Sequence, residues 1–132
     1  MTVLTNLAKE KLKDDNGFVS ANNYNILFVS ENYCEMEAVM NNASFNPFGI
    51  AHGGYVFGLA DTAAGVAAMT DERTAVTISS NIEYLKSGKG SKLIAKAKAL
   101  KTGKNISVIE VFIYDEKDIL IAKANFNYYY LN

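Results

Sequence analysis

Apolar residues recur at two different periods along the chain, and the change of period predicts where helices and strands lie. Residues 1–15 carry apolar side chains at helical spacing, with Lys and Glu between them, which predicts a short amphipathic helix. Residues 24–40 are rich in β-branched and aromatic side chains and predict one or two strands, interrupted near Glu31.

The stretch 53–70 is apolar on nearly every side, which predicts one long, buried helix. It is rich in Gly and Ala, with pairs four residues apart such as Gly54 and Gly58 or Ala60 and Ala64. Residues four apart lie on the same face of a helix, so such pairs leave flat strips against which a sheet or a second helix can pack closely.

Beyond residue 72 the chain alternates with the period of strands, and short polar breaks at 87–90, 101–104 and 115–118 suit hairpin turns. Ile106, Val108 and Phe112 are separated by even numbers of positions, so their side chains should lie on the same face of a strand. Four strands joined in a meander are therefore expected. One antiparallel sheet curled around one central helix accounts for the whole order, which predicts an α+β fold in a single domain over residues 1–132.

Composition narrows the class of protein. Hydrophobic residues make up 49% and charged residues 20%, as in folded globular domains. The single Cys34 excludes an intramolecular disulfide, and no CxxC or Cys/His cluster is present for zinc. The N-terminus lacks the pattern of a signal peptide, and Asp61 interrupts the longest apolar run, which is shorter than the ~20 residues of a membrane span. We expect a cytoplasmic protein with no metal and no membrane partner.

The net charge of −1 argues against broad nucleic-acid binding. The charge is uneven, however, because seven lysines and no acids lie between Glu83 and Glu110. These lysines form either a solvated strand face or a site for a multiply charged anion such as a phosphate group.

His52, Gly53 and Gly54 stand where the long helix should begin. A helix N-terminus leaves backbone N–H groups unpaired and carries partial positive charge. One interpretation is a tight turn in which His52 is a structural residue. The other is an oxyanion hole, in which the Gly53 N–H polarises a carbonyl oxygen.

Asp61 is a lone carboxylate in the apolar helix. A buried carboxylate is costly unless it is paired or functional, so Asp61 is either a packing or interface acid or a general base or nucleophile. It follows Gly53 by eight residues, or roughly 12 Å along a helix. The two cannot both reach one carbonyl group from the same helix, so a shared site requires a second copy of the chain, as in a homodimer with a two-fold axis.

The run from Asn46 to Gly54, followed by Leu59 to Ala63, resembles the PaaI-type acyl-CoA thioesterases of the hotdog superfamily. Their pattern is N-x-x-G-x-x-H-G-G with an acid nine residues after the His, and the match continues at 75–77, 81–85 and 101–104. The resemblance implies a hotdog fold, a dimer or dimer of dimers with sites at the dimer interface, and hydrolysis of a small aryl- or alkyl-CoA thioester. It implies no metal and no other cofactor, since CoA is part of the substrate.

The resemblance also implies a role for each matching residue. Asp61 is expected to act as general base or nucleophile, Gly53 as oxyanion donor and His52 as a support for the loop or the thioester. Asn46 and Thr77, which taken alone suit a turn and a strand, are expected to position water or the carboxylate. Expected substrate contacts are Gly54 and three lysines placed to meet CoA phosphates, Lys86, Lys101 and Lys104.

Two alternatives remain open on the same fold. The first is an acyl-CoA hydratase, although such enzymes usually combine a His with a carboxylate in the helix region, whereas His52 lies in the turn. The second is a non-catalytic acyl-CoA-binding protein.

Overall fold

The computed structural model describes residues 2–13 and 17–132. The N-terminal helix α1 is shorter than the predicted 1–15, of which residues 1, 14 and 15 lie outside the described residues, and the long helix α3 ends two residues before the predicted 70. The helices are α1 Val3–Lys11, α2 Phe18–Ala21 and α3 Gly53–Ala68, with a 3-10 helix at Asn42–Ser44. The strands are β1 Tyr24–Ser30, β2 Tyr33–Val39, β3 Ala75–Tyr84, β4 Lys92–Thr102, β5 Ile106–Asp115 and β6 Leu120–Tyr130.

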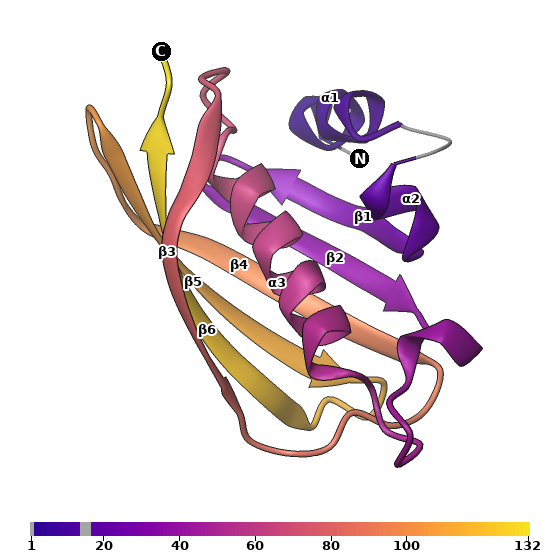
Figure 1. The fold of residues 1–132 in the computed structure, drawn as a ribbon. Coiled ribbons are helices and arrows are strands. Elements are labelled where there is room, and N and C mark those ends of the chain that lie inside the picture. The colour runs from indigo at the N-terminus through magenta and orange to yellow at the C-terminus, as the bar shows by residue number, and fades with distance from the viewer. Residues whose placement is uncertain (1, 14–16) are drawn as a thin grey trace.

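The six strands form one antiparallel sheet in the order β1-β2-β4-β5-β6-β3. The sheet curls around α3, which lies across its concave face, while α1 packs beside β1 (Figure 1). The predicted α+β architecture of one curled antiparallel sheet around one central helix is confirmed.

The predicted meander is wrong at its first connection. β3 pairs with β6 and not with β4, so residues 85–91 cross from the β3 edge past β6 and β5 to the interior strand β4. Gly88 lies in this crossover, where a Cβ would meet Ala51 at 3.0 Å and Ile121 at 3.1 Å. The polar residues at 87–90 mark a break in the strand, but they carry no information about which strand pairs next.

The core lies between α3 and the inward side chains of the sheet. Ile109, Val111 and Ile113 of β5 are fully buried against this core. Ile106, Val108 and Phe112 have the opposite parity and are exposed or half-buried on the outer face. Small residues on the buried positions of β2 and β4 let α3 approach the sheet closely: Ala38, Ala95 and Ala97.

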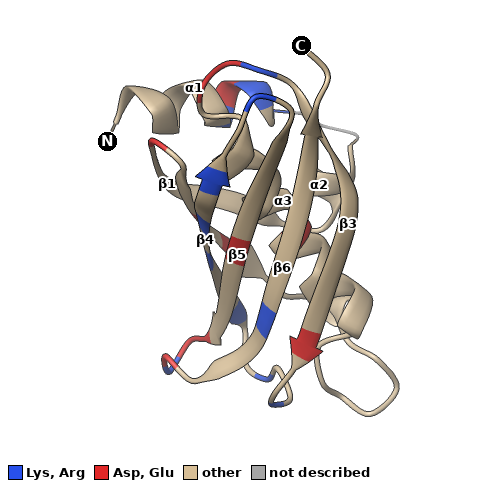
Figure 2. Ribbon diagram, turned by 90° about the vertical axis from the view of Figure 1, so that its left-hand side faces the viewer, with Lys and Arg blue, Asp and Glu red and all other residues tan. Residues whose placement is uncertain are grey.

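Strand β3 has no partner strand on its outer edge among the described residues. Every residue of β3 except Ala75 is exposed or half-buried, including Val76, Ile78 and Tyr84 at 44%, 52% and 52% exposure. Its only charged residue is Glu83, and Figure 2 shows that charged residues gather on β4 and at the ends of the strands. A long edge strand with one charged residue and several exposed apolar side chains is a ready surface for pairing with another chain.

Among the described helices, none is long and apolar enough to cross a membrane.

Candidate active site

The Asp61 carboxylate is held by two hydroxyl groups that both donate to the same oxygen. Asp61 lies half-buried in the third turn of α3. Its Oδ1 accepts hydrogen bonds from the Thr77 hydroxyl at 2.7 Å and the Tyr128 phenol at 2.7 Å. No described residue donates to Oδ2. One carboxylate oxygen is thus fixed, and the other is available to a water molecule or a substrate.

Tyr128 was not predicted as a site residue. It lies on the inward-facing side of β6 and is 3% exposed, and its phenol shares its one proton between Oδ1 and the backbone carbonyl of Asp61, which lies 2.6 Å away. Burial, with a smaller contribution from the nearby Asp61 charge, raises the pKa of the phenol above its usual value, so the group stays a donor. The sequence indicates only that the hydroxyl of a buried Tyr needs a hydrogen-bond partner. The spacing of residues along the chain does not identify that partner.

His52 is the N-cap of α3, with extended backbone at φ −61° and ψ 136°. Its Nδ1 accepts the Gly54 N–H at 2.9 Å, so the neutral imidazole carries its proton on the exposed Nε2. The expected substrate contact Gly54 therefore already uses its N–H within the turn. This arrangement explains why the turn requires an acceptor side chain at position 52.

Gly53 keeps the free donor at the positive end of α3. Its N–H donates to none of the described residues, because the first N–H of a helix has no partner within the helix. Its carbonyl accepts the Tyr84 phenol at 2.7 Å, and a Cβ at this position would lie 3.3 Å from the Tyr84 ring. The N–H is therefore available to a carbonyl oxygen of a ligand.

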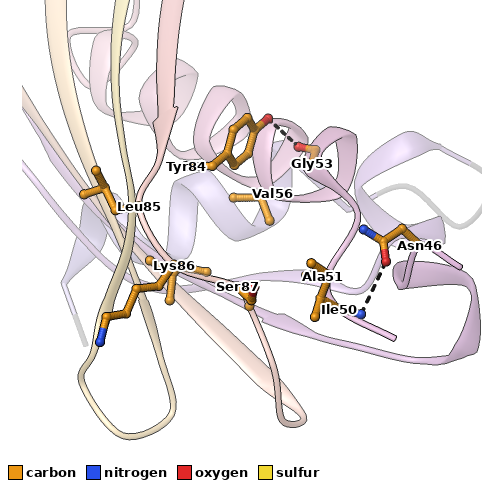
Figure 3. Close-up of a pocket in the computed structure, with 11 residues that line it drawn as sticks. Asn46, Ile50, Ala51, Gly53, Val56, Tyr84, Leu85, Lys86 and Ser87 are labelled. Atoms are coloured by element: carbon orange, nitrogen blue, oxygen red, sulfur yellow. Dashed lines mark hydrogen bonds between the residues drawn. The ribbon is translucent and has the colours of Figure 1, made fainter. Parts of the chain in front are cut away.

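A cavity of about 340 Å³ opens beside Gly53 (Figure 3). Asn46 lines it, and its Oδ1 accepts the Phe48 N–H at 3.0 Å and the Ile50 N–H at 3.4 Å. This oxygen shapes the loop, while the amide nitrogen, which points toward the cavity in Figure 3, has no acceptor among the described residues. Lys86 also lines the cavity, but its side chain extends away from Gly53.

The predicted site residues thus fall into two half-sites. In the cavity half, Asn46 and Gly53 line the cavity and His52 caps the helix beside Gly53. The carboxylate half joins the predicted Asp61 and Thr77 to Tyr128, which was not predicted. None of the carboxylate half lines the cavity, as the spacing along α3 had predicted.

The predicted lysines lie at opposite ends of the sheet. Lys86 follows the end of β3, whereas Lys101 and Lys104 flank the turn between β4 and β5. Arg73, just before β3, donates to the carbonyls of Gly103 and Lys104 at 3.0 and 2.9 Å and so fixes that turn beside the start of β3. All three lysine side chains are exposed.

Over residues 2–13 and 17–132, no group of three or more His, Cys, Asp and Glu side chains could hold a metal ion.

A curled antiparallel sheet wrapped around one long central helix is the architecture of the hotdog fold. The family model described as the thioesterase superfamily matches residues 48–122, and the chain belongs to this family. A relative from Archaeoglobus fulgidus named as an esterase is 32% identical over 108 residues, which cover 81% of this chain and 70% of the relative. The chain is a thioester hydrolase of this superfamily.

Solved structures share this fold. The PaaI protein of Escherichia coli, from a phenylacetic acid degradation operon, superposes with a TM-score of 0.91 at 21% identity, covering 98% of this chain and 94% of that one. A hypothetical thioesterase of Streptococcus pneumoniae TIGR4, solved with coenzyme A, has a TM-score of 0.80 at 31% identity, covering 83% and 87%. A Streptococcus mutans UA159 protein bound to acetyl-CoA has a TM-score of 0.83 at 28% identity, covering 92% and 96%.

Two further structures of the Streptococcus pneumoniae thioesterase carry an aspartate-to-alanine and a threonine-to-alanine change, at positions 16 residues apart. The named relatives are thioesterases and esterases, which favours hydrolysis over the hydratase and non-catalytic alternatives.

Proposed function

We propose that this chain hydrolyses a small acyl-CoA as a homodimer with two composite active sites. Each site combines the cavity half of one subunit with the carboxylate half of its partner. The observation that carries this proposal is that the free Gly53 N–H and the free Asp61 Oδ2 lie too far apart along one helix to act on one carbonyl group.

Strand β3 supplies the geometry for such a dimer. Near its start, Thr77 donates to Asp61, and at its end, Tyr84 donates to Gly53. Antiparallel pairing of two β3 edges across a two-fold axis would set Thr77 of one subunit opposite Tyr84 of the other. The same operation brings each carboxylate half to the partner's cavity half, and it covers the apolar edge that a single chain leaves exposed.

The chemistry of the composite site follows from the two free groups. The Gly53 N–H of one subunit binds the thioester oxygen and stabilises the negative charge that develops there. Oδ2 of Asp61 of the partner subunit takes a proton from water as the water oxygen bonds to the carbonyl carbon. When the tetrahedral intermediate collapses, the C–S bond breaks and the free acid forms. Asp61 returns its proton to the CoA sulfur, which leaves as a thiol, and the carboxylate is regenerated. The proposed reaction uses only residues of the chain and water.

The positions of the lysines favour a substrate that contains CoA. The proposed two-fold axis would bring the Lys101–Lys104 turn of one subunit near Lys86 of the other, since these groups flank opposite ends of β3. Cations gathered from both subunits suit the phosphates of CoA. The relatives solved with coenzyme A or acetyl-CoA agree with this choice, and the 16-residue spacing of the changed aspartate and threonine equals that of Asp61 and Thr77. The choice of a small acyl group, the further pairing of dimers and a cytoplasmic location stay predictions.

The test is Asp61→Asn, assayed by release of free CoA thiol from a panel of aryl- and alkyl-CoA thioesters. This change keeps the size of the side chain but removes the basic oxygen. We expect kcat to fall by about 10²–10⁴-fold with little change in KM, because general-base assistance is lost while substrate binding is kept. Near-full activity of a folded, dimeric Asp61→Asn protein would disprove the proposed mechanism.

A further inference from the structure

Tyr128 contacts the Asp61 carboxylate, but the proposed reaction gives it no step of its own. We infer that Tyr128 is a positioning residue, whose phenol fixes the Asp61 carboxylate so that Oδ2 faces the attacking water. This inference rests on the proposed role of Asp61.

The position of the phenol is unlike that of other tyrosines around α3. Tyr24, Tyr84 and Tyr130 each donate to a backbone carbonyl of α3, at 2.6, 2.7 and 2.7 Å. Tyr128 does the same at Asp61, but its hydroxyl also lies 2.7 Å from Oδ1 of the same residue. One rigid group therefore joins the backbone and the side chain of Asp61, which fixes the side-chain torsion angles.

The surroundings hold the phenol in place. Tyr128 pairs in register with Thr77 of β3 on one side and Ser107 of β5 on the other. Gly65 leaves room for it one turn after Asp61, since a Cβ there would lie 3.3 Å from the phenol oxygen. Tyr128 is 3% exposed, whereas Thr77, the other donor to Oδ1, lies exposed on the edge strand. The more rigid of the two anchors is therefore the phenol.

The number of protons available from the two hydroxyl groups explains why the two carboxylate oxygens of Asp61 have different roles. The Thr77 hydroxyl gives its one proton to Oδ1, and the phenol shares its one proton between Oδ1 and the Asp61 carbonyl. Burial keeps the pKa of the phenol above its usual value, so it donates and does not compete as a base. Oδ1 is thereby occupied, and Oδ2 is the oxygen left for water.

Tyr128→Phe tests this inference, with Tyr130→Phe as the matched control. Tyr130 is on the same strand and face, is 4% exposed, and donates to the carbonyl of Ala68 but to no side chain. Both variants lose one phenol-to-helix bond, so we expect similar falls in melting temperature. Only Tyr128→Phe should lower kcat, by about 10- to 100-fold with KM unchanged within about twofold, since a misplaced catalytic group costs about that much.

A double-mutant cycle separates positioning from general structural damage. In the Asp61→Asn background, Tyr128→Phe should cause no further fall in kcat, because the carboxylate through which the phenol acts is already gone. Equal kcat values for Tyr128→Phe and Tyr130→Phe, or full additivity with Asp61→Asn, would overturn the inference. If Asp61→Asn itself is fully active, the proposed function fails first. If Asp61→Asn is inactive while Tyr128→Phe keeps the wild-type kcat, only the role of Tyr128 fails.

Discussion

Replacing Gly53 by proline should remove the oxyanion donor and leave the fold nearly intact. The Gly53 N–H donates to no described residue, so its loss breaks no hydrogen bond of the chain. Position 53 is the first of the helix, where proline is favoured. His52, with φ −61° and ψ 136°, already has the backbone conformation that a residue before proline prefers.

The size of the effect can be isolated with Gly53→Ala as the reference variant. Both substitutions place a Cβ about 3.3 Å from the Tyr84 ring, so this crowding cancels when the two are compared. Alanine keeps the N–H and proline lacks it. Removing one oxyanion-hole donor costs about 2.7–4 kcal/mol of transition-state stabilisation, so kcat/KM of Gly53→Pro should be about 10²–10³-fold below that of Gly53→Ala.

The assay is release of CoA thiol under steady-state conditions, with melting temperature and dimer mass measured on the same samples. We expect the two variants to melt within a few degrees of each other and to remain dimeric. A kcat/KM for Gly53→Pro within about threefold of that for Gly53→Ala would show that this N–H does not bind the developing oxyanion.

Other parts of the molecule give four further predictions. Lys101→Ala with Lys104→Ala should raise KM for acyl-CoA and leave kcat nearly intact, with no effect on an acyl-pantetheine that lacks the nucleotide; an equal effect on both substrates would contradict phosphate binding. Static light scattering at micromolar concentration should give the mass of a dimer or a dimer of dimers, and an active monomer would contradict the composite site. Burial raises the pKa of the Cys34 thiol to about 12, so this thiol should stay protonated and unreactive toward a disulfide reagent at neutral pH until the protein unfolds. The same shift should lower the free energy of unfolding as the pH rises above about 9, because the unfolded thiol ionises there while the folded thiol does not.

Periodicity predicted the elements of this fold but not all of their pairing. The helix at 53–70 and the strands after residue 72 lie where the pattern placed them, because local side-chain burial determines both. The pairing of β3 with β6 depends on contacts between residues far apart in the sequence. The alternation of side chains within β3 is compatible with pairing to either β4 or β6. The polar break at 87–90 resembles a hairpin turn because its residues do not indicate which strand pairs next.

The candidate site was predictable where one residue's chemistry was unusual for its surroundings. A lone Asp61 in an apolar helix and glycines at a helix start both stand out without a structure. The separation of the site into two halves also followed from helix geometry alone. The contact of Tyr128 with Asp61 joins residues 67 positions apart, and only the folded sheet brings them together. Gly54 was expected to contact the substrate, but in the structure its N–H donates to the side chain of His52. The sequence did not reveal this use of the N–H.

Complementation between two inactive variants tests the composite site most directly. In a hybrid dimer of Asp61→Asn and Gly53→Pro subunits, one site carries both changes and the other carries neither. Random re-association of equal amounts makes half of the dimers hybrids, each with one intact site of two, so we expect recovery of roughly a quarter of the wild-type specific activity. Subunit exchange is verified by the mass of differently tagged chains. If hybrids form and no activity returns, Gly53 and Asp61 do not act across the interface, and the composite site is wrong.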